Sequence, residues 1–179
     1  IAIGRLDINT SGLLLFTNHG ELANRLMHPS YEVQREYMAR IHGEVDEAMI
    51  KRLTEGVVLE DGVASFKSVK AQHARSSDDA GGRNRWFKVI LAEGRTREVR
   101  RLWESQEVEV NRLKRISYGP IELPSIVRRS DFLELDPKQV VSLFKAVGLH
   151  PPRFTEKHVL KDMRERKEKK LRARGNTWR

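Results

Sequence analysis

A carboxylate near the start of the chain is the first candidate for chemistry. Asp7 lies in a mostly polar segment that ends at the apolar run 13–16. Short loops on a rigid scaffold commonly present catalytic groups, and an aspartate there can act as a nucleophile or a base. Asp7 can also form an Asx turn, with Thr10 and Ser11 closing the same bend. On the pattern alone, that structural role is the more common one.

A cluster of positive charge is the second candidate, because four arginines lie within the seven residues 95–101. If this segment is helical, Arg97 and Arg101 share one face, and Arg100 is spaced to pair with Glu104. An arginine drawn to the edge of the core would need a carboxylate partner, because an unpaired buried charge is costly. The alternative is a solvated basic face, or one that binds phosphates without chemistry.

Tyr37 is the third candidate. It shares one face of an alternating segment, 33–41, with Val33 and Ile41, so burial in a core is the ordinary expectation for this tyrosine. Its ring can instead serve as a platform on which an unstacked base lies.

Several other chemistries lack the residues they need. The chain has no cysteine, which excludes disulfides, thiolate catalysis and cysteine-ligated zinc, and which fits a reducing cytoplasm. Its six histidines show no metal-ligand spacing with acidic residues. Neither a Walker motif nor a dinucleotide fingerprint is present. We therefore expect no metal and no small-molecule cofactor. No apolar run approaches the length of a membrane span, so we expect no membrane partner.

The charge is unevenly distributed along the chain. A net charge of +9 and a pI near 10.0 indicate a polyanionic partner, nucleic acid before membrane. Residues 150–179 hold eleven basic and four acidic residues, a net charge of +7, which leaves +2 for residues 1–149. We expect 1–149 to form one domain and 150–179 a basic charged tail.

The elements that must position these residues combine helices and strands without strict alternation, which indicates an α+β class. Asn18 is the predicted cap of the first helix, and Asp136 followed by Pro137 marks the start of the last. Residues 76–82 are expected to form a polar hairpin tip. The predicted strands are 13–16, 33–41, 57–59, 64–71, 86–91, 108–118 and 131–135, and the predicted helices are 20–27, about 45–55, 96–105 and 136–148.

Taken in order, several segments resemble the pseudouridine synthases that modify ribosomal RNA, in the branch that holds both small-subunit and large-subunit enzymes. The similarity covers about residues 1–149 and is carried by Gly4–Leu15 with Thr17–Gly20, Arg35–Tyr37, Glu93–Gln106, Arg112–Arg115 and Tyr118–Pro120. It implies a pseudouridine synthase fold, with a mixed, mainly antiparallel central sheet flanked by helices and an active-site cleft across the sheet. His19 and Glu107 depart from the usual aspartate and glycine of the family, which affects local turns only.

The resemblance also implies a reaction. Uridine becomes pseudouridine when the bond from its ring nitrogen to the sugar breaks, the base rotates, and carbon 5 joins the sugar, with no cofactor or metal. Asp7 would be the catalytic carboxylate. Arg100 would keep it ionised from salt-bridge distance, and Tyr37 would stack under the base and could help remove the carbon 5 proton. The substrate-binding residues would be Arg5, Leu6, Thr10, Arg95, Arg97, Arg101 and Leu113.

The implied partner is ribosomal RNA, 23S rather than 16S, near the peptidyl transferase centre, in the cytoplasm. Because the family carries a small RNA-binding domain upstream, we expect this chain to begin inside the catalytic domain. The alternative is a non-catalytic RNA-binding module that acts through the basic tail and needs neither Asp7 nor Arg100.

Overall fold

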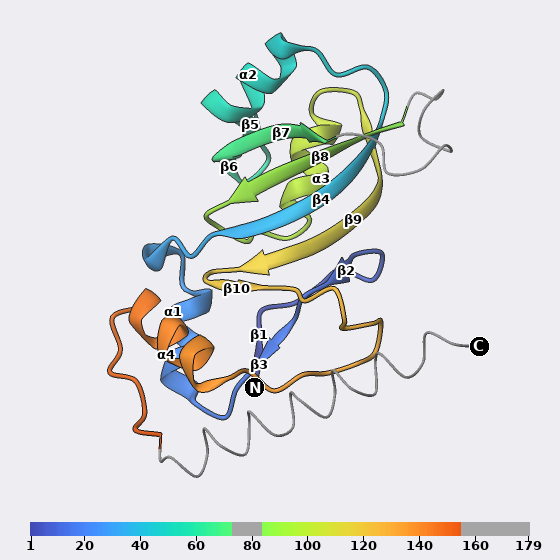
Figure 1. Cartoon of the computed structure of the whole chain (residues 1–179). Helices are drawn as coiled ribbons and strands as arrows, with labels where there is room; N and C mark the ends of the chain where they lie inside the picture. The colour runs from blue at the N-terminus through green and yellow to red at the C-terminus, as the bar shows by residue number, and fades with distance from the viewer. Residues whose placement is uncertain (73–83, 155–179) are drawn as a thin grey trace, which may run out of the picture.

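A twisted sheet built mainly of antiparallel strands forms the centre of the protein (Figure 1). The computed structural model describes residues 1–72 and 84–154. Five strands of the sheet run in the order β10 (Ile121–Glu122), β9 (Glu109–Tyr118), β4 (Arg35–His42), β8 (Asn84–Leu91) and β7 (Ser68–Gln72). The short β2 (Ser11–Gly12) joins β9 in parallel. This mixed sheet with flanking helices confirms the predicted α+β class.

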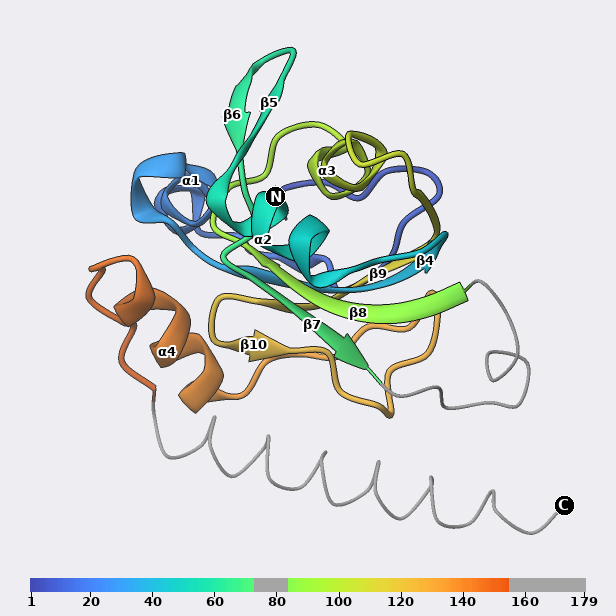
Figure 2. The ribbon, with the colours of Figure 1, turned by 90° about the horizontal axis from the view of Figure 1, so that it is seen from above.

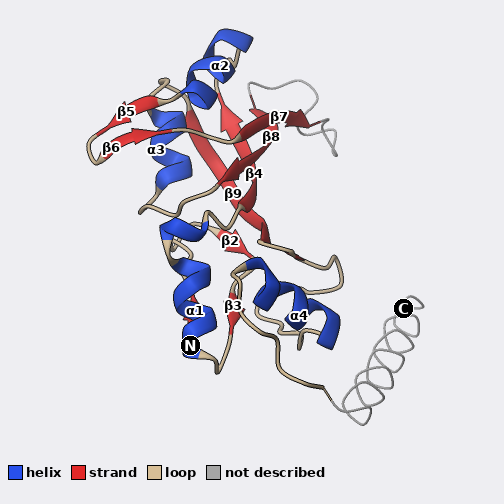
Figure 3. Ribbon diagram, turned by 90° about the vertical axis from the view of Figure 1, so that its left-hand side faces the viewer, coloured by secondary structure: helices blue, strands red, loops and turns tan. Residues whose placement is uncertain are grey.

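The remaining elements are two small ribbons and the helices. β1 (Ala2–Ile3) pairs with β3 (Leu15–Phe16), and β5 (Val57–Leu59) forms a hairpin with β6 (Gly62–Ala64). The helices are α1 (Gly20–Met27), α2 (Glu47–Glu55), α3 (Glu98–Glu104) and α4 (Pro137–Ala146), with a 3-10 turn at Pro29–Tyr31. Figures 2 and 3 show α2 and α3 on the same face of the long strands.

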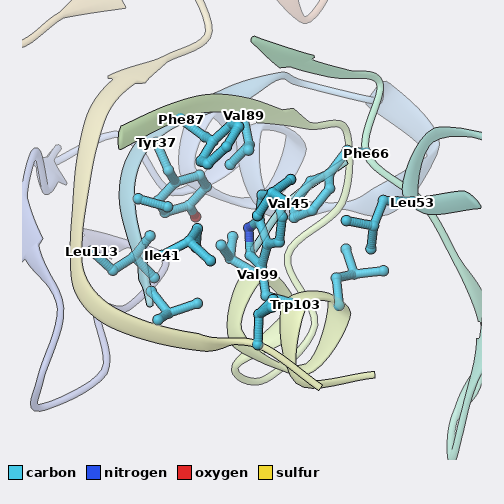
Figure 4. Close-up of a cluster of buried hydrophobic side chains, with 14 of the residues drawn as sticks. Tyr37, Ile41, Val45, Leu53, Phe66, Phe87, Val89, Val99, Trp103 and Leu113 are labelled. Carbon is cyan, nitrogen blue, oxygen red and sulfur yellow. The ribbon is translucent and has the colours of Figure 1, made fainter. Parts of the chain in front are cut away.

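Alternation of side chains gives the sheet one buried face. On β4, Tyr37, Ala39 and Ile41 are buried, and Phe87 and Val89 lie beside them on β8. This face packs against α2 and α3, where the buried Trp103 contacts Phe66 and Phe87 (Figure 4). A second cluster contains Leu22 and Leu26 of α1, Leu143 and Phe144 of α4, and Tyr118 at the end of β9.

Most helix boundaries follow the predicted signals. Asp136 caps α4 in a capping box with Gln139, and Pro137 occupies the first turn, as predicted. α2 begins after the cap Asp46 and ends at Gly56. The predicted cap of α1 is wrong, because the side chain of His19, one residue after Asn18, accepts the hydrogen bond from the Leu22 amide (3.1 Å).

The predicted strands differ from the structure in three places. Residues 131–135 form no strand, because Asp131 closes a turn with Arg128 and leaves Phe132 93% exposed. The segment 13–16 is divided: Leu15–Phe16 pairs with the chain start, while Leu13 follows β2. The segment 64–71 divides between β6 and β7. The predicted hairpin tip at 76–82 and most of the predicted tail lie outside the described residues.

Candidate active site

A cavity of about 240 Å³ opens between the Asp7 loop, the ends of β4 and β9, and the segment that leads into α3. Eight of the ten expected site residues line it: Arg5, Leu6, Asp7, Thr10, Tyr37, Arg95, Arg97 and Leu113. Arg100 and Arg101 do not. Ten further residues line the cavity, and four of them carry the ionisable or hydrogen-bonding groups described below: Arg35, Glu98, Arg115 and Tyr118.

The loop that carries Asp7 lies tightly against β9. The Thr10 amide donates to the Asp7 carbonyl (2.8 Å), which closes the turn, and the Leu13 amide donates to the Arg115 carbonyl (2.9 Å). At Gly12, with φ +113°, an added Cβ would lie 2.1 Å from the Arg115 carbonyl oxygen. Only glycine permits this approach. Within 1–72 and 84–154, the Asp7 carboxylate has no ion pair or hydrogen bond, so it remains available at the cavity.

Two buried guanidinium groups hold this loop by its backbone. Arg115, 3% exposed, donates through Nε to the Leu13 carbonyl (2.8 Å) and through Nη1 to the Arg5 carbonyl (3.3 Å). It therefore binds the loop on both sides of Asp7. Arg100, 5% exposed, donates through Nη2 to the Asn9 carbonyl (3.0 Å) and through Nη1 to the Val110 carbonyl of β9 (2.6 Å).

The burial expected for Arg100 is confirmed, but the expected ion pairs are not. No Arg100 contact within 4 Å of the Asp7 or Glu104 carboxylate occurs in the described part of the chain, and Glu104 lies near Arg97 instead (3.7 Å). The reason is that the Arg100 guanidinium donates to two backbone carbonyls. Burial lowers the pKa of Arg100, the charge of Arg97 lowers it further, and the charge of Asp7 raises it, so Asp7 acts on Arg100 through space.

Tyr37 and Leu113 line the cavity from neighbouring strands. Both side chains are buried among the core residues of the sheet (Figure 4), at 9% and 5% exposure. No hydrogen bond of the Tyr37 hydroxyl occurs among the residues that the structure describes, although the side chain borders the cavity. A flat ring and a branched aliphatic chain at one cavity suit an aromatic ligand.

A third buried arginine, Arg35, lies with Arg115 around the ring of Tyr118. The Cζ atoms of Arg35 and Arg115 lie 4.8 and 5.2 Å from its ring centroid. Arg35 is also buried and donates to the Tyr118 hydroxyl (2.9 Å) and the Val33 carbonyl (2.8 Å). Neither arginine has a carboxylate partner within the described ranges. This wall of the cavity therefore carries positive charge without a protein anion, which favours a negatively charged ligand.

Arg95 and Arg101 bind protein groups. Arg101 forms a two-point ion pair with Asp61, the turn residue of the β5–β6 hairpin, at 2.8 and 2.9 Å. Arg95 donates to the Glu93 carboxylate (3.0 Å) and to the Val63 carbonyl (2.9 Å). The Arg101 guanidinium holds the pKa of Asp61 down at about 2. These arginines attach the hairpin to the cavity wall, and Arg95 alone of the two borders the cavity.

Glu98 is a buried carboxyl group at the start of α3. It is 2% exposed, and its Oε2 accepts the Arg95 amide (2.9 Å), while Oε1 has no partner in the described part of the chain. The pKa of Glu98 is raised to about 7, mainly by burial and in part by the neighbouring Glu93 carboxylate, while the Arg95 amide acts in the opposite direction. The neighbouring Arg97 adopts a left-handed backbone conformation (φ 52°) at the cavity, a strain typical of functional loops.

The burial of Arg35 and Arg115 could have been predicted from the sequence. Arg35 shares its side of β4 with Tyr37 and Ala39, and Arg115 shares its side of β9 with Leu113, so strand alternation places both on the core face. The burial of Glu98 could not have been predicted in this way, because it depends on the turn before α3. Among the described residues no group of three potential metal ligands occurs, and no helix is long and apolar enough to cross a membrane.

The sequence pattern of the family described as RNA pseudouridylate synthase matches residues 1–105, more than half of the chain. The chain belongs to this family. Ribosomal large subunit pseudouridine synthase B of Pasteurella multocida is 55% identical over 174 residues, which cover 96% of this chain and 48% of that protein. The protein of the same name from Escherichia coli (strain K12) is 51% identical over 172 residues, which cover 96% and 57%. The chain thus spans about half the length of the curated relatives it matches.

Solved structures agree with this family assignment at the level of the fold. A crystal structure of pseudouridylate synthase superposes with a TM-score of 0.68 at 22% identity, over 79% of this chain and 58% of that one. A chain of an archaeal box H/ACA sRNP complex superposes with a TM-score of 0.51 at 18% identity, over 90% and 49%. The pseudouridine synthase fold implied by the sequence is therefore confirmed.

Proposed function

We propose that this chain carries the catalytic domain of a ribosomal RNA pseudouridine synthase, with Asp7 as its catalytic carboxylate. One observation carries the proposal. Asp7, whose carboxylate lacks a protein partner in the described ranges, borders the same cavity as Tyr37 and Leu113 in a chain of the pseudouridylate synthase family. The domain would comprise residues 1–149, followed by the basic tail 150–179.

The geometry suggests how the cavity would hold a uridine. The base would lie between Tyr37 and Leu113, where its ring replaces contacts that it loses on leaving the RNA stack. Asp7 would then face the bond between base and sugar, as a nucleophile or as a base on the ribose. Its loop is fixed at Arg5, Asn9 and Leu13, so little reorganisation is needed when the uridine arrives.

The positively charged residues of the site have two roles: some hold the Asp7 loop, and others would bind RNA. Arg100 and Arg115 would fix the Asp7 loop and supply a positive field. Arg97 and the exposed Arg5, both at the cavity, would contact the sugar and phosphates of the RNA. Leu6 and Thr10 border the same opening. Arg101 would contribute to RNA binding only indirectly, because its guanidinium binds Asp61.

The names of the relatives guide the choice of substrate. Because they are described as enzymes of the large ribosomal subunit, we infer that the target uridine lies in 23S rather than 16S RNA, near the peptidyl transferase centre. A cytoplasmic location follows from a ribosomal substrate. An upstream RNA-binding domain would contribute affinity in the full-length protein.

Replacing Asp7 by asparagine tests the proposal, because the amide keeps the shape but cannot attack or remove a proton. Pseudouridine formation should fall below about one per cent of wild type, while RNA affinity stays within about a few-fold, since a lost catalytic group costs several kcal/mol in the transition state only. Full turnover by Asp7→Asn would refute the catalytic role. Unchanged RNA binding with no isomerisation by the wild-type protein would favour the alternative, a non-catalytic RNA-binding module.

A further inference from the structure

The face of the sheet opposite the cavity carries two rows of side chains, six of the eight polar or basic. Strand register places Lys70, Lys88, Met38 and Lys114 side by side across β7, β8, β4 and β9. The next row holds Gln72, Trp86, Arg40 and Arg112 on the same four strands. We call these eight residues the basic sheet face. None of them lines the cavity.

This arrangement opposes like charges. Lys70 lies directly opposite Lys88, and Arg40 directly opposite Arg112. Like charges in such cross-strand positions destabilise a sheet. Among the described residues, Glu36 offsets part of the charge by pairing with Lys88 (3.2 Å). The face therefore concentrates positive charge, which lowers the stability of the sheet. An anionic partner bound to this face would offset that repulsion.

The basic sheet face is also open. α2 and α3 cover the other side of these strands, and α4 lies beyond the β10 edge of the sheet and not over these four strands (Figures 1 and 3). Lys70, Arg112 and Lys114 are exposed, in contrast to the buried Tyr37, Phe87 and Leu113 on the opposite side of the same strands. Three strand spacings separate Lys70 from Lys114, a row of about 14 Å.

We propose that the basic sheet face is a second RNA-binding surface, which holds phosphates of the same RNA whose uridine enters the cavity. Lysine and arginine side chains in rows suit phosphodiesters, which they bind without reading sequence. This inference rests on the proposed function for the identity of the RNA. Because the cavity and the basic sheet face lie on opposite sides of one sheet, RNA can reach both only by extending round an edge. A large folded RNA can do so, whereas a short target loop cannot.

A triple variant tests this surface: Lys70→Gln, Arg112→Gln and Lys114→Gln together. All three side chains are exposed and none belongs to the cavity. The matched control removes three charges elsewhere, with Lys51→Gln on α2 and Lys138→Gln and Lys145→Gln on α4, all exposed. Binding of a fluorescent hairpin RNA of arbitrary sequence is measured over a series of salt concentrations. The melting temperature of each variant verifies folding.

The expected result is a flatter salt dependence for the sheet-face variant only. Each lost phosphate contact removes about 0.7–0.9 from the slope of log affinity against log salt, so three contacts remove about 2. In isomerisation assays KM should rise for a long ribosomal RNA fragment and not for a short hairpin that contains the target, with kcat unchanged for both. Equal slopes for the two triple variants would overturn the proposal. If the sheet-face variant shows a flatter salt dependence but the wild-type protein forms no pseudouridine, the proposed function is refuted, while the RNA-binding role of the basic sheet face is supported.

Discussion

The guanidinium of Arg100 donates a hydrogen bond of 3.0 Å to the backbone carbonyl of Asn9, two residues beyond Asp7. The buried cation thus holds the Asp7 loop by its main chain, while the Asp7 carboxylate stays free of protein partners in the described ranges. A direct ion pair would have to be broken or shared when substrate binds. Attachment through the backbone positions Asp7 and avoids that cost.

We expect Arg100→Lys to be poorly tolerated. A lysine retains the charge, but its single ammonium cannot span the Asn9 and Val110 carbonyls as the planar guanidinium does. Loss of one charge-assisted hydrogen bond corresponds to about a 10- to 100-fold drop in kcat. The control is Arg52→Lys, an exposed arginine of α2 remote from the cavity, which should retain activity. Wild-type kcat in Arg100→Lys would show that the charge alone suffices.

Gly12→Ala should displace the Asp7 loop. The new Cβ would meet the Arg115 carbonyl at 2.1 Å and would have to adopt φ +113°. Gly148→Ala is the matched control, since Gly148 also has a positive φ (+66°) but nothing within 4 Å of the added Cβ. Both variants should lose about 1–2 kcal/mol of stability from backbone strain. Only Gly12→Ala should also lose most of its turnover, measured at equal fractions of folded protein.

Sequence patterns predicted the features that depend on neighbouring residues, such as strand burial and helix caps. They did not predict the contacts between segments that are distant in the sequence. The alternation of side chains along the strand placed Tyr37 on its buried face. Arg35, two residues earlier, lies on the same face and is therefore also buried. The cap and proline at Asp136 fixed the start of α4. The partners of Arg100 could not be predicted, because they are carbonyl groups on a loop and a strand that come together only in the folded chain. Most of the expected site residues border the cavity, but its ten other lining residues and the hydrogen bonds that hold the site were not predicted.

Glu98 should make stability depend on pH. Burial raises its pKa from 4.5 to about 7, so between these values the folded protein binds a proton that the unfolded chain has released. The contribution of Glu98 is therefore fully present below pH 4.5 and is lost as the pH rises towards 7. Glu98→Gln keeps an acceptor for the Arg95 amide and cannot ionise. Its melting temperature should exceed that of wild type at pH 7 by more than at pH 4.5. Equal differences at both pH values would contradict the raised pKa.

Deleting residues 150–179 tests the predicted role of the basic tail, which holds +7 of the +9 net charge. If it binds phosphates, RNA affinity should weaken for all sequences alike and the salt dependence should flatten. Turnover at saturating RNA should survive, because every proposed catalytic residue precedes residue 114. An unchanged slope with a lower melting temperature would show that the tail stabilises the domain instead.

β9 belongs to both hydrophobic clusters, contributing Leu113 to the one beneath α3 and Tyr118 to the one between α1 and α4. The part of the strand between these two residues is also a wall of the cavity, where Arg115 holds the Asp7 loop. Neither cluster can open on its own without removing that wall. We therefore expect the cavity to be lost as soon as either cluster unfolds, so the less stable of the two clusters sets the stability of the site.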